Sequence, residues 1–155
     1  MLLNGEDNYP SNLIEDVRED RYLKNIIEDF QKDKTLDSIW KQAKFLVKQK
    51  RYGELFKTIE SSNLEHKEEF LNILIKDSIN EGDFLSAGHI AEIKGDYDKA
   101  IELYDKCYNY EDIFRIILEV EYNKKYKYIY YRLIDIKIKE KNNEALVQLI
   151  KITGD

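Results

Sequence analysis

The sequence predicts an all-α fold built from short antiparallel helical hairpins, and three observations lead to this class. The 155-residue chain has one proline and six glycines, fewer than the many turns of a β-sandwich or barrel recruit. Apolar residues recur at three- and four-residue steps, as they do on one side of an amphipathic helix. The triplet glycine, aspartate, aromatic occurs at Gly82-Asp83-Phe84 and again thirteen residues later at Gly95-Asp96-Tyr97.

The N-terminal half of the chain contains four predicted helical segments. Amphipathic stripes run from Asn12 to Phe30 and from Leu36 to Val47, separated by the polar break 31–35. A short apolar segment follows at 52–59. The sequence 62-SNLE-65 has the spacing of a capping box, in which the serine and the glutamate each satisfy a backbone donor, and it predicts a helix from Leu64 to Asn80.

The repeated triplet predicts the junctions between the helices that follow. Gly82 suits the left-handed position that ends a helix, Asp83 suits the N-cap of the next helix, and Phe84 begins a new apolar stripe. A weaker third copy without glycine stands at 108-YNY-110. The thirteen-residue step leaves helices of about ten residues, roughly 15 Å long, which are too short to be stable alone. They are therefore expected to pack as antiparallel hairpins.

The C-terminal segment combines positive charge with tyrosine. Lys124 to Lys141 contains six lysines and one arginine against two acidic residues, a net charge of +5, whereas the whole chain carries −6. A helix places Tyr126, Ile129, Tyr130, Leu133 and Ile136 in one stripe, with the lysines opposite as a solvated face. The alternation within 134–139 also permits a strand, but a strand among helices has no partner, so a helix is favoured.

This basic segment supplies candidate partner-binding residues, because aromatic rings beside cations can stack on nucleobases or hold an acidic peptide. Three interpretations stay open: an ordinary solvated face, a site for an acidic partner protein, and a nucleic-acid interface. The overall net charge of −6 disfavours the last of these. The candidate residues are Lys124, Lys125, Tyr126, Lys127, Tyr128 and Arg132.

Residues 81–114 resemble a tetratricopeptide repeat. They span 34 positions, with residues of the family's types at its spacing: Phe84, Gly88, Gly95, Tyr97, Ala100, Tyr104 and Cys107. A degenerate copy lies near 36–69. The pattern departs from the family at Ala87 and Ala91, which replace larger apolar residues, and at Asp112, which replaces a proline. The helical-hairpin solenoids of vesicle-coat and ciliary-transport proteins, which also carry Gly-Asp-Tyr at helix junctions, are a looser resemblance.

The resemblance implies a right-handed stack of hairpins, a single-domain α-solenoid over residues 1–155. Its predicted parts are an acidic N-terminal helix at 1–35, tetratricopeptide-like hairpins at 36–114, and C-terminal helices with the basic, tyrosine-rich face at 115–155. His89 and the nearby Glu92 fall on the helix with which this family lines its concave groove. Both are therefore candidate partner-binding residues.

The chain offers no constellation of catalytic or metal-ligating residues. It has two histidines and one cysteine and matches no nucleophile, phosphate-loop or zinc motif, so no enzyme activity, cofactor or metal is expected. Cys107 occupies a small-residue position of the repeat and is predicted to be a core thiol. A lone cysteine forms no internal disulfide, which favours the cytoplasm. No signal peptide or membrane span is predicted.

These observations favour a non-catalytic protein-binding module, an adaptor, scaffold or assembly subunit that holds a peptide or helix of a partner protein. An alternative is a small acidic inhibitor or immunity-type protein that blocks a basic active site or nucleic-acid channel. Residues 1–30 carry a net charge of −5, which suits such an inhibitor. The same charge allows head-to-tail self-association with the basic segment of a second copy.

Overall fold

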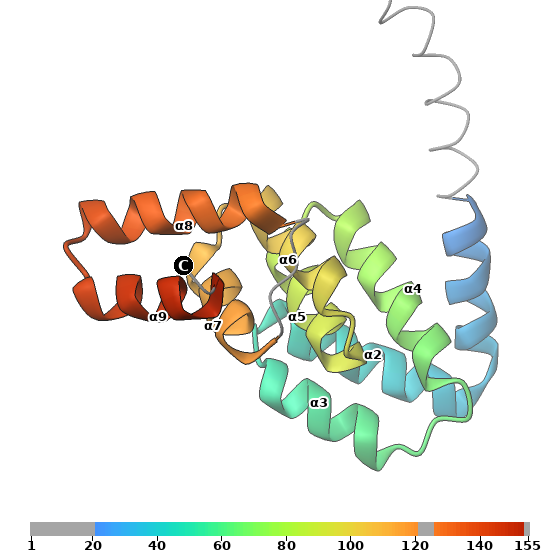
Figure 1. Cartoon of the computed structure of the whole chain (residues 1–155). Coiled ribbons are helices and arrows are strands. Elements are labelled where there is room, and N and C mark those ends of the chain that lie inside the picture. The colour runs from blue at the N-terminus through green and yellow to red at the C-terminus, as the bar shows by residue number, and fades with distance from the viewer. Residues whose placement is uncertain (1–20, 121–125, 154–155) are drawn as a thin grey trace, which may run out of the picture. The chain divides into compact units, whose positions relative to one another are not determined.

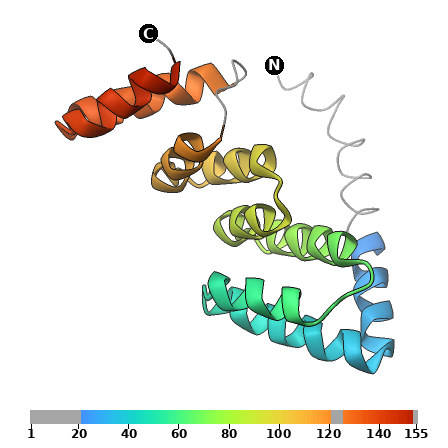
Figure 2. The same ribbon diagram turned by 60° about the horizontal axis from the view of Figure 1, so that its bottom comes forward.

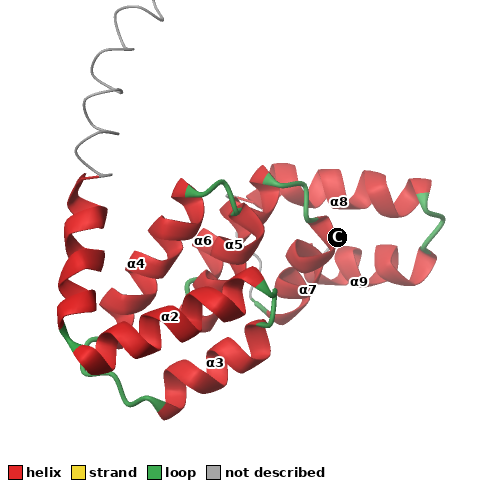
Figure 3. Ribbon diagram, turned by 180° about the vertical axis from the view of Figure 1, so that it is seen from behind, coloured by secondary structure: helices red, strands yellow, loops and turns green. Residues whose placement is uncertain are grey.

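The computed structural model describes residues 21–120 and 126–153, and every regular element within them is a helix (Figures 1 and 3). The prediction of an all-α fold is confirmed. Residues 21–32 are helical. The following helices are α2 (Lys34–Lys48), α3 (Tyr52–Ser61), α4 (Lys67–Asn80), α5 (Phe84–Lys94), α6 (Tyr97–Lys106), α7 (Tyr110–Glu119), α8 (Lys127–Lys139) and α9 (Asn143–Thr153).

The contacts divide the chain into two compact units, unit 1 at residues 1–96 and unit 2 at residues 97–155, and each is described by itself. In unit 1, α2 pairs with α3 and α4 pairs with α5, and α3 also contacts α5 (Figures 1 and 2). In unit 2, α6 pairs with α7 and α8 pairs with α9, and α7 also contacts α9. Each unit thus consists of consecutive helical hairpins.

The hairpins differ in phase from the repeat that the sequence indicated. The degenerate copy near 36–69 coincides with the α2–α3 hairpin, but residues 81–114 contain α5, α6 and part of α7. In the structure α5 pairs with α4 and α6 pairs with α7, so the clearest sequence repeat crosses the boundary between the units. The coarse expectation of repeated helical hairpins is confirmed, whereas the right-handed stack and the three-part division stay predictions.

One geometry recurs at five helix junctions. Residues with left-handed backbone stand at each of them, with φ of 57° at Lys50, 79° at Gly82, 88° at Gly95, 58° at Tyr108 and 59° at Lys141. In every case this residue's N–H donates to the carbonyl three residues back, and the next N–H to the carbonyl five back. This is the Schellman motif, which satisfies the last carbonyls of a helix.

The residue after the left-handed position often caps the next helix. The Asp83 carboxylate accepts from the Ser86 N–H at 3.0 Å, and the Asn142 side chain accepts from the Ala145 N–H at 3.1 Å. Asn109 accepts likewise from Asp112, at 3.5 Å. The interpretation of Gly-Asp-aromatic as helix punctuation is therefore confirmed, including its third copy without glycine.

The capping box predicted at 62–65 is wrong. Ser62 ends α3, and its hydroxyl donates to the Ile59 carbonyl at 2.7 Å. Asn63 has a left-handed backbone with φ of 52°, which turns the chain before α4 begins at Lys67. The serine hydroxyl satisfies the end of one helix and does not cap the next.

Two residues of the predicted repeat are less buried than expected. Cys107 lies in the turn after α6 and is half-buried, with its sulfur 3.5 Å from the Tyr104 carbonyl oxygen. It was expected in the core, but α6 ends at Lys106, before the helix could carry this position inward. Tyr97, another residue of the repeat pattern, is exposed, whereas Ala100 and Tyr104 are fully buried.

Candidate functional site

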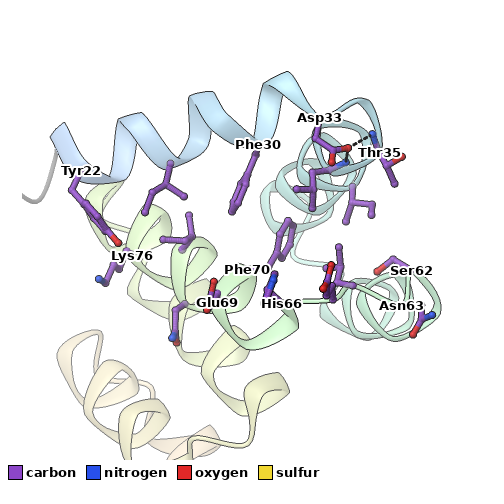
Figure 4. A pocket seen from close by; sticks show the side chains of 17 residues that line it. Tyr22, Phe30, Asp33, Thr35, Ser62, Asn63, His66, Glu69, Phe70 and Lys76 are labelled. Carbon is purple, nitrogen blue, oxygen red and sulfur yellow. Dashed lines mark hydrogen bonds between the residues drawn. The ribbon is translucent and has the colours of Figure 1, made fainter.

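Unit 1 contains a groove of about 610 Å³. It lies between the helix of residues 21–32, the start of α2, the turn before α4 and α4 itself (Figure 4). Apolar side chains from all four segments contribute to its lining. They are Ile26, Phe30, Leu36, Ile39, Leu64, Phe70 and Ile73.

Two aromatic rings of the groove, Phe30 and Phe70, belong to a cluster with Trp40, which lies behind them. The Phe30 ring lies 5.6 Å from both the Trp40 and the Phe70 rings, and the Trp40 and Phe70 rings are 5.7 Å apart. One pair is stacked, one is tilted and one is edge-on, at spacings that aromatic pairs prefer. Phe70 and Trp40 are buried, whereas Phe30 is half-buried and lines the groove. The groove is thus anchored in the core of unit 1.

Charged side chains stand at opposite ends of the groove. Glu65 and Glu69 lie at the start of α4, and neither carboxylate has an ion-pair partner within the described ranges. At the other end, the Lys76 ammonium lies 5.9 Å from the centre of the Tyr22 ring (Figure 4). Asp33 also borders the groove, but its carboxylate caps α2 by accepting from the Thr35 N–H at 2.9 Å. The groove is therefore acidic at one end and basic at the other.

A second hollow, of about 440 Å³, lies against a neighbouring side of the helix of residues 21–32 and is lined by Leu23, Ile27 and several polar residues. Leu23 is buried, whereas Ile26 and Ile27 are both half-buried and line different hollows. The adjacent isoleucines therefore form a matched pair for mutagenesis.

His89 and Glu92, which were predicted to bind a partner, are held by contacts within unit 1. The His89 ring stacks on the Tyr52 ring with centroids 4.0 Å apart, and its Nδ1 lies 3.6 Å from a Glu92 carboxylate oxygen. The Tyr52 hydroxyl lies 2.8 Å from the Ser86 Oγ. Both predicted residues are half-buried, so their visible role is to join α3 to α5.

Ion pairs strengthen the same α3–α5 contact. The Lys50 ammonium donates to Asp83 at 2.7 Å and to the buried Ser86 hydroxyl at 3.0 Å. Burial raises the pKa of Asp83, but the hydrogen bonds from Lys50 and Ser86 outweigh it and hold that pKa below its ordinary value. Burial also raises the pKa of Tyr52, which stays a neutral hydroxyl. These polar contacts connect the junction between α2 and α3 to the junction between α4 and α5.

In unit 2, the exposed Arg132 has several partners from its own unit. Its Nη1 donates to Asp105 at 2.8 Å and to the Tyr110 hydroxyl at 2.6 Å. Its guanidinium lies 5.7 Å from the Tyr110 ring and 5.6 Å from the Tyr128 ring. The Tyr128 hydroxyl donates to Asp105 at 3.2 Å. Arg132 and Tyr128 thus connect α8 to α6 and α7, and their predicted binding of a partner stays a prediction.

The remaining predicted residues of the basic segment have varied settings. Tyr126 is buried, and its hydroxyl donates to Asp98. Lys127 is exposed, with its ammonium 5.7 Å from the centre of the Tyr131 ring. Lys124 and Lys125 lie outside the described residues. The prediction of helix over strand is confirmed, since α8 spans Lys127–Lys139.

The prediction that the lysines of α8 form a solvated face is wrong for Lys137. Its side chain is only 4% exposed, and its ammonium donates to Glu111 at 3.0 Å and Glu140 at 3.1 Å. It also lies 5.0 Å from the centre of the Phe114 ring. The reason is that the aliphatic stem is buried while the ammonium lies over the ring and reaches two exposed carboxylates.

The basic surplus of this segment is partly neutralised within unit 2. Arg132 is paired with Asp105, Lys137 with Glu111 and Glu140, and Lys139 with Asp135 at 3.1 Å. Among the described lysines of the segment, Lys127 and Lys141 have no ion pair. The described contacts therefore favour a structural role for much of this face.

Sequence reasoning missed the groove. The predicted residues belong to different units, with His89 and Glu92 in unit 1 and the others in unit 2. The groove residues come from four separate segments, each of which has the pattern of an ordinary amphipathic helix or turn. One signal was present: Ile26 and Ile27 are adjacent, so the apolar side of that helix is wider than a single packing face requires.

Comparison of the chain with protein-family models, with curated proteins and with solved structures finds no significant match. The residues that the structure describes contain no cluster of three or more histidine, cysteine or carboxylate side chains suited to a metal ion. Within the same residues, each helix is too short or too polar to traverse a bilayer.

Proposed function

We propose that the protein is a non-catalytic protein-binding module, an adaptor or assembly subunit that holds a short helix or peptide of a partner protein. The groove of unit 1 carries this proposal. Its volume of about 610 Å³ falls within the range of roughly 300–1,000 Å³ that is common for ligand-binding pockets. Its apolar floor and few charged groups are suited to side-chain anchors and offer no reactive constellation.

The repeated hairpins support the same proposal. Stacked helical hairpins resembling tetratricopeptide repeats present helix faces, and the grooves between them, to peptides and helices of other proteins. This support is a likeness of architecture, whereas the groove is a feature of this chain. The lone Cys107 is consistent with a protein of the reducing cytoplasm, where we place it.

The matched isoleucines test the proposal. A displayed library of helical and extended peptides is selected against the purified full chain, and the affinities of the selected peptides are then measured for Ile26→Gln and Ile27→Gln. We expect Ile26→Gln to weaken binding at least tenfold, because it places an amide in the floor of the groove. Ile27→Gln changes the helix equally but faces the second hollow, and should leave the affinity within about twofold.

Circular dichroism establishes that both variants are folded. If both variants weaken binding equally, the binding surface lies elsewhere. The same conclusion follows if neither variant changes the affinity of the native chain.

The acidic-inhibitor alternative remains a second prediction. The acidic pairs of the N-terminal segment, Glu15-Asp16 and Glu19-Asp20, lie outside the described residues. Reversing these four charges should abolish binding if they act as a decoy for a basic site. The same change should leave a peptide held in the groove largely unaffected.

A further inference from the structure

We infer that the occupant of the groove is a short amphipathic helix with a definite polarity: its N-terminal end is basic and lies against Glu65 and Glu69, and its C-terminal end is acidic and lies at Lys76. This inference rests on the proposed protein-binding function. It adds the conformation of the partner segment, its charge pattern and its direction in the groove.

The walls of the groove favour a helix over an extended peptide. They are built mainly from the helix of residues 21–32, α2 and α4, whose interior backbone groups are bonded within the helices. An extended peptide would find no sheet edge to pair with and would leave its own backbone groups unsatisfied. A helix satisfies its backbone internally and needs only a surface for its apolar side chains.

Two charged residues of the groove are two helical turns apart. Glu69 and Lys76 are seven residues apart on α4, which corresponds to roughly 10 Å along the helix axis. Apolar anchors at positions i, i+3 or i+4, and i+7 of a partner helix span the same distance. Phe70 and Ile73 lie between Glu69 and Lys76 in the sequence of α4, and Ile26 of the 21–32 helix lines the same groove, so these side chains are the surface on which the anchors would pack.

The charges give the direction. A helix carries a partial positive charge at its N-terminus and a partial negative charge at its C-terminus. Glu65 and Glu69 are exposed and have no ion-pair partner within the described ranges, so they suit the positive end of an incoming helix. Lys76, which is exposed beside the Tyr22 ring, suits the negative end.

The same charges disfavour one nearby occupant, the N-terminal segment of this chain. Residues 1–20 contain six acidic side chains and one basic side chain. Their net charge of −5 is of the same sign as Glu65 and Glu69. A partner with a basic end is therefore the better match than this segment.

A simpler role for Glu69 must be separated from ligand binding. Glu68 and Glu69 both lie in the first turn of α4, where acidic residues stabilise a helix through its dipole. Only Glu69 lines the groove. Glu68→Gln is therefore a matched control for Glu69→Gln, because both remove one charge from the same helix turn.

The experiment uses synthetic helical peptides of about 15 residues, long enough to begin forming a helix in water. The first has leucine anchors at i, i+4 and i+7, two lysines at its N-terminal end and two glutamates at its C-terminal end. The second has glutamine at all four charged positions, and the third has the lysines and glutamates exchanged. Binding to the full chain is followed through Trp40, the only tryptophan of the chain, which contacts the groove residues Phe30 and Phe70.

We expect the first peptide to bind most tightly and the exchanged peptide most weakly. Exposed ion pairs contribute a factor of roughly two to five each at moderate salt, so Glu65→Gln with Glu69→Gln should weaken the first peptide about fivefold or more. Lys76→Gln should weaken it by a smaller factor. None of these variants should change the affinity of the glutamine peptide. The control Glu68→Gln should change neither the affinity of the first peptide nor that of the glutamine peptide.

Two results would overturn the inference. Equal affinity for the three peptides would show that the groove does not distinguish the direction of the bound helix. An equal effect of Glu68→Gln and Glu69→Gln on binding would show that Glu69 acts through the stability of α4. In both cases the proposed protein-binding function would survive if Ile26→Gln still abolished binding. Loss of all peptide binding in the native chain, with none selected from the library, would instead remove the proposed function.

Other occupants give distinct outcomes. Substituting serine for Leu13, Ile14 and Val17 in the full chain should leave peptide affinity unchanged. A rise in affinity would show that the N-terminal segment fills the groove and would contradict the inference. Sedimentation should show the same mass for the native chain and Ile26→Gln, and a dimer lost on that substitution would identify a second copy as the occupant.

Discussion

Unit 1 and unit 2 use their aromatic and charged side chains in different ways. In unit 1, Phe30 and Phe70 line a groove with Trp40 packed against them, and two carboxylates of the groove have no ion-pair partner within the described ranges. In unit 2, Arg132 lies near two tyrosine rings and bonds to Asp105.

This difference shows that a surplus of charge in one segment of the sequence does not by itself identify a binding surface. Two carboxylates from outside the basic segment pair with it and stand far away in the sequence, 27 residues from Arg132 for Asp105 and 26 residues from Lys137 for Glu111. Only the fold brings them together. Glu65 and Glu69 of the groove, by contrast, have no ion pair within the described ranges.

The largest expected effect tests the aromatic wall of unit 1. Phe70→Ala should lower the free energy of unfolding of unit 1 by about 3–5 kcal/mol, because a ring that is 2% exposed leaves a cavity. Phe45→Ala on α2 is the control, since Phe45 is 54% exposed and should cost no more than about 0.5 kcal/mol. Urea unfolding followed through Trp40 emission measures both. Similar losses for the two variants would contradict the assignment of the cluster to the core.

Much of the fold could be predicted from the sequence because helix punctuation is a local property. Gly82-Asp83 and Gly95-Asp96 carry both the left-handed residue and the capping residue in adjacent positions. The junctions at Lys50 and Lys141 have the same geometry but no glycine. The local sequence does not indicate these two junctions, because lysine seldom has a left-handed backbone conformation.

The candidate site could not be predicted because it is a product of packing. Ile26, Ile39, Leu64 and Ile73 each belong to an ordinary apolar stripe, and only the arrangement of four segments leaves them around one groove. His89 and Arg132 were predicted to bind a partner. In the structure the His89 ring stacks on the Tyr52 ring, and the Arg132 guanidinium donates a hydrogen bond to Asp105.

An intermediate effect is expected at Lys137 in unit 2. Lys137→Ala should destabilise unit 2 by about 2 kcal/mol, near the lower limit for buried side chains, because a buried aliphatic stem is lost while Glu111 stays solvated. Lys137→Met retains the stem and should cost less than half as much. Amide hydrogen exchange in α7 and α8 measures the change. Equal effects of the two variants would show that the charge, and not the stem, stabilises this contact.

The pH dependence provides a second measure of Lys137. Burial lowers the pKa of its ammonium, but hydrogen bonds to Glu111 and Glu140 outweigh burial and raise that pKa above its ordinary value of 10.5. The stability contributed by this group is therefore complete below about pH 10.5 and is lost as the pH rises through the folded-state pKa. The stability difference between the native chain and Lys137→Met should shrink above that pH. A difference that stays constant would exclude the ion pair as its source.

The smallest effects are expected at the helix junctions, where the two units are alike. Gly82 of unit 1 and Tyr108 of unit 2 have φ of 79° and 58°, and both make the Schellman hydrogen bonds. A left-handed backbone costs a side chain roughly 1–2 kcal/mol, and the added freedom of glycine in the unfolded chain returns about half of that. Tyr108→Gly should therefore stabilise unit 2 by about 0.5–1 kcal/mol, because the tyrosine is 77% exposed and has little packing to lose.

Gly82→Ala provides the reciprocal test in unit 1. An added Cβ would meet no atom within 4 Å, so the expected loss of about 1 kcal/mol comes from the backbone conformation alone. Thermal unfolding of both variants gives the two signs. A gain of stability for Tyr108→Gly and a loss for Gly82→Ala would show that the same backbone energetics govern the junctions of both units. The difference between the units would then lie in their surfaces. Destabilisation by Tyr108→Gly would show instead that the exposed ring of Tyr108 stabilises unit 2, and the likeness of the junctions would then be one of geometry without one of energy.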